Sequence, residues 1–440
     1  MWNAIKLALG MKPQFQRAQD PDTHKNIAFL DRMGRVLTPP ADPAAALGHA
    51  TASQTLFDAI RRRAGELELQ VSVKGVLAVQ IDGVVHTLSP VEREAGSAMI
   101  RQLKQYAGLD PAEIRKPQRG DLTARALGRT IRLTVSTLAT SAGEVLNVRI
   151  FQGEDVLFRL EDLGLLQRQL EQVQAAIQSE KRAILVAHAK RQGASTTLYA
   201  LAREHDAFMK NILLFERQSL TALDNIRQFV VPYDTPAQSL LAHLKEQLIA
   251  EPDLLIIDPI DNAPLAQAAA QAAAAGRGLY ASVDAGDSFA AIAQWTRLVG
   301  EPALAARELS VVIAAKLIRK LCPDCREAYV PEPSLLRKLN LPADRIAQLY
   351  RAPGKPKLDP KGKPLICETC QGTGYFGQMA IFEVLPITEE LRSAIAENAA
   401  AETLRKLARK DRMLFVQEVG LRRVIEGVTS VQEILRISQA

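Results

Sequence analysis

Apolar residues in the middle of the chain fall into short continuous runs rather than long periodic stretches. Four such runs alternate with helical stretches, at residues 184–186, 212–215, 254–257 and 279–283. Short apolar strands separated by helices are typical of a mostly parallel sheet with right-handed crossovers. The pattern therefore predicts an α/β fold for this region.

The preceding region, residues 51–160, mixes helical and strand-like patterns. Helical periodicity covers 53–65 and 91–107, and strand-like runs cover 67–73, 76–81, 84–88, 130–136 and 145–151. Asp82 and Gly83 separate two of these strands, and Asp-Gly is a strong signal for a hairpin turn. These patterns predict a compact α/β module.

Residues 1–50 show no sustained periodicity, and Pro39, Pro40 and Pro43 interrupt the stretch that leads into the module. We expect an irregular N-terminal arm here. A short helix on a membrane surface is the alternative, because apolar and basic residues are mixed between Trp2 and Arg17.

Helical patterns predominate towards the end of the chain. They cover 162–181, the alanine-rich run 263–275, the segment 311–321, and the tail 388–440, where several short helices are expected. Together with the apolar runs they define one region, residues 161–440, that contains the parallel sheet.

Composition narrows the class of protein. Apolar residues make up 47% of the 440 residues, which is enough for packed cores. The net charge is only +6, and basic and acidic residues are interleaved, so a solvated surface is favoured over a nucleic-acid site. No apolar run is long enough to span a membrane, and residues 2–11 are too short for a convincing signal peptide. We therefore expect a cytoplasmic protein that binds no nucleic acid.

All four cysteines lie in the last third of the chain, as the pairs Cys322/Cys325 and Cys367/Cys370. Cytosolic thiols stay reduced, and two C-x-x-C pairs supply four thiolates for a tetrahedral zinc site. The pairs are further apart than in a usual zinc ribbon, and free structural thiols are the alternative. The favoured interpretation is a zinc finger inserted over residues 321–372.

Residues 184–199, ILVAHAKRQGASTTLY, have the layout of a strand, a phosphate-binding loop and a helix. Gly193 and Ser195 occupy the second glycine and the hydroxyl position of the P-loop pattern G-x-x-x-x-G-K-[ST]. His188 replaces the first glycine, and Ala194 replaces the lysine. Taken alone, this incomplete loop does not establish a nucleotide site.

Longer stretches resemble the ATPases of type II secretion and type IV pilus assembly, the secretion system protein E family. The stretches are GASTTLYALARE at 193–204, AEPDLLIID at 250–258, LIRKLCPDC at 317–325, CETCQGTGYFGQMAIFEVLPIT at 367–388 and GVTSVQEILRIS at 427–438. The resemblance runs from about residue 50 to the end. It implies a RecA-like P-loop ATPase core that follows a small α/β N-terminal domain, with an inserted four-cysteine zinc finger and a helical C-terminal region.

The resemblance also implies a function. Members of the family form hexameric motors that use ATP and magnesium to extend a pilus or pseudopilus through an inner-membrane platform. This chain is accordingly expected at the cytoplasmic face of the inner membrane, with a platform protein as its partner. The family's first N-terminal domain, which docks on the platform, is expected to be shortened or missing. The residues that correspond to nucleotide ligands are Gly193, Ser195, Thr196 and Arg149.

The residues that perform the family's chemistry are largely replaced. Ala194 stands in place of the Walker A lysine, and Pro259, after Asp258, stands in place of the Walker B glutamate. The aspartate-box glutamate is matched by Glu216, but the family's histidine is Asp284. Arg217-Gln218 stands in place of the family's Asp-Pro, and Asp261-Asn262 stands in place of its Arg-Asp. Three family arginines are replaced by Lys245, Ile249 and Thr134.

Three functions remain in competition. The first is a catalytically inactive subunit of a secretion or pilus motor, which joins a ring with a complete ATPase paralogue. The second is an active but divergent ATPase, in which Lys190 replaces the lysine and Asp258 holds magnesium. The third is a nucleotide-sensing module that uses Arg149 and Ser195 without turnover.

Overall fold

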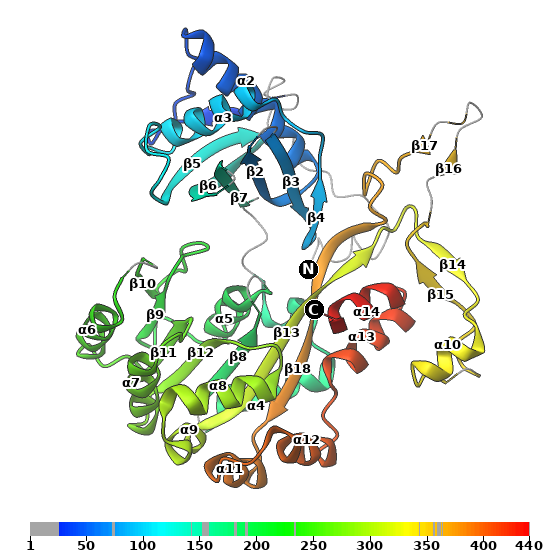
Figure 1. The fold of residues 1–440 in the computed structure, drawn as a ribbon. Helices are drawn as coiled ribbons and strands as arrows, with labels where there is room; N and C mark the ends of the chain where they lie inside the picture. The colour runs from blue at the N-terminus through cyan, green and yellow to red at the C-terminus, as the bar shows by residue number, and fades with distance from the viewer. Residues whose placement is uncertain are drawn as a thin grey trace. The chain divides into compact units, whose positions relative to one another are not determined.

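The computed structural model describes residues 26–72, 75–141, 143–151, 158–179, 183–189, 192–232, 235–342, 344–354, 357–358, 362 and 364–439. The chain divides into two compact units, Met1–Glu154 and Asp155–Ala440, and each has its own large sheet (Figure 1). Among the described residues, no helix combines the length and apolar character that crossing a bilayer requires.

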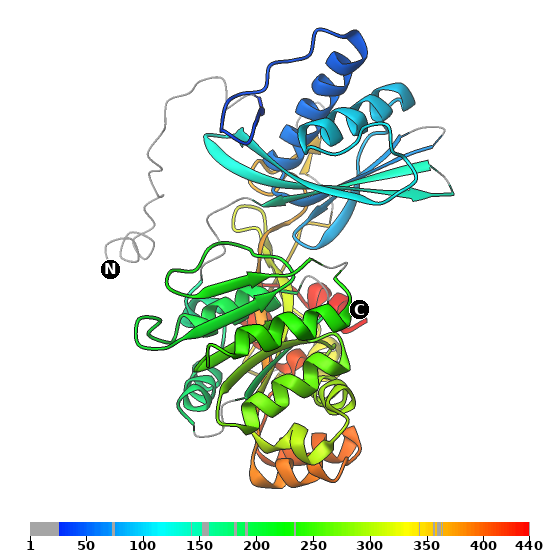
Figure 2. The same cartoon turned by 90° about the vertical axis from the view of Figure 1, so that its left-hand side faces the viewer.

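The first unit is built on a seven-stranded antiparallel sheet. Its strands, in spatial order, are β1 (Ala28–Leu30), β5 (Gln118–Ala126), β6 (Arg129–Thr140), β7 (Gly143–Phe151), β2 (Ala64–Val71), β3 (Gly75–Ile81) and β4 (Val84–Thr87). Helices α2 (Pro43–Arg61) and α3 (Arg93–Tyr106) cover one face of this sheet (Figure 2). Leu56 and Met99 from the helices and Leu67 and Leu133 from the sheet are fully buried in one core.

The predicted hairpin is confirmed. Asp82 and Gly83 connect β3 to β4 with φ values of 48° and 77°, the left-handed backbone that a tight hairpin turn requires. The prediction of an irregular arm over residues 1–50 is wrong for β1 and for the start of α2, which are regular elements. Residues 1–25 lie outside the described residues. Pro43 begins the helix instead of interrupting it, because the Asp42 side chain accepts a hydrogen bond from the Ala45 backbone N–H at 2.9 Å.

The second unit contains the predicted, mostly parallel sheet. Its strands, in spatial order, are β10 (Arg227–Val230), β9 (Ile212–Glu216), β11 (Leu254–Asp258), β12 (Gly278–Asp284), β8 (Ala183–His188), β13 (Leu309–Leu321) and β18 (Tyr375–Pro386). All neighbours are parallel except β13 and β18, which are antiparallel.

The helix predicted over 311–321 is wrong, because this segment is strand β13. Alanine, leucine and lysine favour a helix locally. Here the segment lies between β8 and β18 and hydrogen-bonds to both, and its residues from Val311 to Ala315 are buried on both faces of the sheet. Tertiary pairing thus overrides local propensity.

Helices cover both faces of this sheet. Apolar residues of α4 (Gln167–Gln178) and α5 (Ala194–Ala202) pack with Ile184, Val186 and Ile256 on one face. Those of α6 (Ala237–Leu248), α7 (Ala263–Ala274), α8 (Ser288–Val299) and α9 (Pro302–Arg307) pack with Leu185 and Leu255 on the other. Alternate strand residues therefore point to opposite helical layers. The helix predicted over 162–181 begins only at α4, after a short 3-10 turn at Leu160–Leu163.

The C-terminal tail forms the expected short helices: α11 (Glu389–Ala396), α12 (Ala401–Lys410), α13 (Val416–Ile425) and α14 (Val431–Gln439). Between β13 and β18 the chain leaves the sheet as an insertion. Its elements are β14 (Glu327–Tyr329), α10 (Pro333–Lys338), β15 (Leu349–Arg351), β16 (Lys357–Leu358) and β17 (Pro364–Leu365).

Candidate functional site

The carboxyl ends of the parallel strands bring most of the predicted site residues to one edge of the sheet. Strands β8, β9, β11 and β12 end at His188, Glu216, Asp258 and Asp284. Ligands of open α/β sheets bind outside this edge. The predicted residues therefore lie where such folds usually bind ligands, and the chemistry depends on which groups meet there.

The described end of the loop after β8 shares two features with a phosphate loop, a left-handed glycine and the start of a helix. Gly193 has a φ of 91° and caps α5, in a conformation that disfavours a side chain. The backbone N–H of Leu317 donates to Gln192 Oε1 at 2.8 Å and ties the loop to β13. Ala194 is buried and offers only a methyl group where a lysine would contact the β/γ-phosphates. Lys190 lies outside the described residues.

Ser195 is already engaged with the end of β11. Its hydroxyl donates to Asp258 Oδ2 at 2.5 Å, and Ser282 donates to Oδ1 of the same carboxylate, also at 2.5 Å. In P-loop enzymes a hydroxyl and an acid at such positions hold magnesium. Neighbouring oxygens on Mg²⁺ lie about 2.9 Å apart, given Mg–O distances near 2.1 Å. The Ser195 oxygen keeps lone pairs for a metal while it donates to Asp258, and the observed spacing is close to this value, so the pair remains compatible with magnesium.

Glu216 belongs to a buried network rather than to an open site. Its carboxylate accepts from Tyr199 OH at 2.8 Å and from Gln228 Nε2 at 3.1 Å. Burial raises the pKa of Glu216 to about 7, and it raises the pKa of Tyr199 to about 12. The network joins α5, β9 and β10. The Glu216 carboxyl is only partly ionised at neutral pH, because its pKa is about 7.

This buried carboxyl gives the fold a pH dependence. The usual pKa is 4.5 and the folded value is about 7, so the folded state holds the extra proton between these pH values. Stability therefore falls as the pH rises from about 4.5 to 7, by about 3 kcal/mol for a shift of this size.

Glu216→Gln removes the ionisable group and is expected to raise the free energy of unfolding by about 1–3 kcal/mol at pH 8, with little change at pH 5. Denaturant unfolding at both pH values measures the effect. Glu402→Gln, on the exposed face of α12, is the control and should change neither value. An equal effect of Glu216→Gln at both pH values would contradict the conclusion that ionisation of the buried Glu216 carboxyl causes the pH dependence.

Sequence reasoning missed an ion pair beside these groups. Arg217 NH2 contacts Asp261 Oδ2 at 2.8 Å, and Arg217 NH1 donates to the Pro232 carbonyl at 3.1 Å. The resemblance implies an aspartate at position 217 and an arginine at 261, the reverse of the charges found here. The signal was present as two opposite replacements, which sequence reasoning treated as separate losses.

Acidic groups outnumber basic ones among the described residues at this edge. Acidic groups are contributed by Glu216, Asp258, Asp261 and Asp284. Among the described residues at these strand ends and in the loop 192–195, the one cation is Arg217, which is paired with Asp261. Phosphoryl transfer relies on positive groups around the phosphates, and Lys190 and Arg191 of this loop lie outside the described residues.

Two further residues, Thr196 and Arg149, were predicted as nucleotide ligands. Thr196 is half-buried in the first turn of α5. Arg149 lies on β7 of the first unit, where its guanidinium lies 5.2 Å from the Phe151 ring centre. Thr134, opposite it on β6, donates to Asp121 Oδ1 at 2.7 Å.

The four cysteines form one cluster at the base of the insertion. The Sγ atoms of Cys322 and Cys367 are 3.8 Å apart, those of Cys325 and Cys370 are 3.6 Å apart, and all four lie within 4.8 Å of one another. A tetrahedron with 2.3 Å Zn–S bonds has edges of about 3.8 Å. The backbone N–H of Gly374 also donates to Cys370 Sγ at 3.3 Å. The four cysteines therefore fit a metal ion that binds four thiolates in a tetrahedron, such as zinc.

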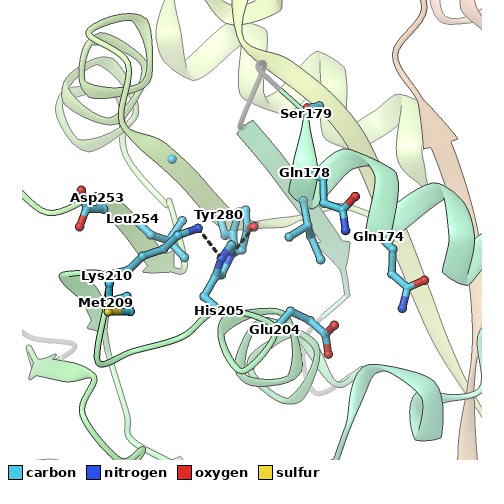
Figure 3. Close-up of a pocket in the computed structure, with 12 residues that line it drawn as sticks. Gln174, Gln178, Ser179, Glu204, His205, Met209, Lys210, Asp253, Leu254 and Tyr280 are labelled. Carbon is cyan, nitrogen blue, oxygen red and sulfur yellow. Dashed lines mark hydrogen bonds between the residues drawn. The ribbon is translucent and has the colours of Figure 1, made fainter.

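A cavity of about 530 Å³ lies at the opposite, amino edge of the same sheet, between the ends of α4 and α5 (Figure 3). Lys210 Nζ approaches His205 Nδ1 at 3.0 Å, and His205 Nε2 lies 2.7 Å from Tyr280 OH. Glu204 and Asp253 also line it, so its charges are mixed (Figure 3). The sequence carried no recognisable signal for this cavity, because its residues come from separate segments.

Comparisons with known proteins identify the family and the fold. A family model described as "Type II/IV secretion system protein" matches residues 46–436. Type II secretion system protein E of Klebsiella pneumoniae is 30% identical over 388 residues, covering 87% of this chain and 74% of that protein. The putative type II secretion system protein E of Escherichia coli K12 is 29% identical over 386 residues, covering 88% and 76%. The ATPase DotB of Legionella pneumophila has a TM-score of 0.60 at 14% identity, covering 88% of this chain and 95% of that one, which shows a shared fold.

Proposed function

Because the chain belongs to the type II/IV secretion system protein family, we propose that it is a non-hydrolysing subunit of such a system's cytoplasmic motor at the inner membrane. The observation that carries the proposal is the buried alanine, Ala194, that starts α5 at the position of the Walker A lysine. The positive charge that this position would place on the phosphates is therefore missing. A structural or regulatory role in the ring is then the function that the retained fold supports.

Loss of turnover follows from several independent replacements. Phosphoryl transfer depends on positive charge around the phosphates and on a group that orients the attacking water. Ala194 supplies no charge, and Pro259 supplies neither a carboxylate nor a backbone N–H. The exchanged pair Arg217–Asp261 holds its own charges together. Measurements of nucleotide binding and of phosphate release by the purified chain test the proposal directly.

The alternatives differ from this proposal in measurable ways. An active, divergent ATPase would release phosphate and would lose that activity on Ser195→Ala. A nucleotide-sensing module would bind nucleotide without releasing phosphate, through Ser195 and Arg149.

We further propose that the cysteine cluster holds one zinc ion as a structural site. Four thiolates without histidine or water leave no open coordination position, which is typical of structural rather than catalytic zinc. Cys322 and Cys325 would hold it at the end of β13, and Cys367 and Cys370 at the start of β18. The ion would thus close the base of the insertion without taking part in any reaction.

Assembly follows from the same proposal. In a ring whose nucleotides lie between subunits, bound nucleotide contributes interface energy. Because the nucleotide site of this chain has lost ligand residues, we expect a weak homo-oligomer. We expect firmer association with a complete ATPase paralogue or an inner-membrane platform protein. Light scattering over a range of concentrations, with and without ATP, measures this. A stable homohexamer that forms without any partner would contradict the expectation.

A further inference from the structure

A separate cavity of about 440 Å³ opens where α4, β18 and the α12–α13 connection meet. Helices α4 and α13 both pack against β18 (Figure 1). Apolar side chains of Leu166, Val384 and Leu414 line the cavity, together with three arginines, Arg168, Arg412 and Arg422. The cavity lies outside the strand edge that carries Ser195.

Of the three glutamines that line the cavity, Gln167, Gln169 and Gln172, the buried one, Gln169, already has hydrogen-bond partners within the protein. The Gln169 side-chain oxygen accepts from the Leu166 backbone N–H at 3.0 Å, and its nitrogen donates to the Phe382 carbonyl at 2.7 Å. Its hydrogen-bonding capacity is thus largely used by the protein. The wall therefore offers a ligand mainly apolar contact, and the arginines at the rim offer charge.

The three arginines have no acidic counterpart. No carboxylate lines the cavity, and none of the ion pairs among the described residues includes any of the three. The nearby acids of α13 are paired elsewhere, Glu418 with Arg409 and Glu426 with Arg423, each at 2.8 Å. Arg168 donates only to the backbone carbonyl of Asp411, at 3.3 Å. Three like charges around an apolar wall repel one another unless an anion joins them.

We propose that this cavity binds a small anionic amphiphile, a phosphate or carboxylate group attached to an apolar body. Guanidinium groups match phosphate and carboxylate in a bidentate geometry, and the apolar wall accepts the attached chain. The volume falls within the range of small-molecule sites. The ligand bridges α4 and the α12–α13 connection. It is either a soluble molecule or the head and upper chain of a membrane lipid, because both present the same chemistry.

The test uses the full chain and three probes. Dodecyl phosphate below its micellar concentration carries both features, inorganic phosphate carries only the anion, and dodecanol carries only the apolar chain. Isothermal titration is expected to show saturable one-site binding of dodecyl phosphate, at least tenfold tighter than either of the other probes. The double variant Arg412→Gln/Arg422→Gln is expected to weaken this binding by tenfold or more. Arg345→Gln, an exposed arginine in the insertion, is the matched control and should leave binding unchanged.

Vesicles separate the two sources of ligand. Co-sedimentation with phosphatidylglycerol vesicles that is lost in the double variant assigns a membrane lipid, whereas binding of dodecyl phosphate without vesicle binding assigns a soluble ligand. Equal affinity for dodecyl phosphate and dodecanol, binding that the double variant does not alter, or no binding of dodecyl phosphate overturns the proposal. Arg412 and Arg422 are exposed, so the substitutions should leave the fold intact, which unchanged thermal unfolding verifies.

Discussion

The purified chain is expected to release no phosphate from ATP above a mock-purified control, and the substitution Ala194→Lys is not expected to start turnover. The lysine would restore one positive charge at the start of α5 and with it some affinity for nucleotide. The attacking water would remain unoriented, because Pro259 occupies the position of the Walker B glutamate. Loss of one group in such a site costs on the order of 10³ in rate, and several are missing together.

The repaired variant also has to overcome the charge of the strand edge. Asp258 is bonded to Ser195, and Glu216 and Asp284 add further acid at neighbouring strand ends. We therefore expect Ala194→Lys to bind a fluorescent ATP analogue more tightly than the parent chain, at unchanged phosphate release. Ala194→Gln, similar in length but uncharged, is the matched control and should not improve binding.

One pattern of results would contradict the pseudo-ATPase proposal. Steady-state phosphate release by the parent chain, abolished by Ser195→Ala, would show that the divergent site hydrolyses ATP. Tight binding by the parent chain without release, weakened by Ser195→Ala, would instead support the nucleotide-sensing module.

The sequence was informative wherever local chemistry determines structure. Asp82-Gly83 predicted its hairpin because few residue pairs adopt that backbone, and the apolar runs predicted the central strands because strands buried on both faces are apolar throughout. Cysteine spacing predicted the cluster because each short pair supplies two ligands from one turn.

Properties that depend on tertiary partners were beyond the sequence. Strand β13 carries a helix-favouring composition, and only its pairing with β8 and β18 makes it a strand. The Arg217–Asp261 pair and the Ser195–Asp258 bond join segments that are far apart in the sequence. Their effect on the phosphate site appears only when the strand ends are brought together.

Removal of the metal is expected to have the second large effect, and it should be confined to the insertion. We expect one zinc ion per chain in protein purified without chelator, and Cys367→Ser should lose most of it. Thiolate zinc sites in small domains contribute about 10–16 kcal/mol of apparent binding energy, which here would hold the insertion closed. The central sheet has its own buried core, which does not include the cysteines, so it should remain folded.

Metal analysis and hydrogen exchange together distinguish this result from general unfolding. In Cys367→Ser, amides between 326 and 351 should exchange faster, while those of β8, β11 and β12 keep the protection of the parent chain. The matched control is Thr369→Ala, which lies in the same turn and removes a hydrogen bond to Asp324 without removing a thiol. This variant should keep its zinc. Absence of metal from the parent chain would refute the site, since four thiols at tetrahedral spacing would then be held by packing alone.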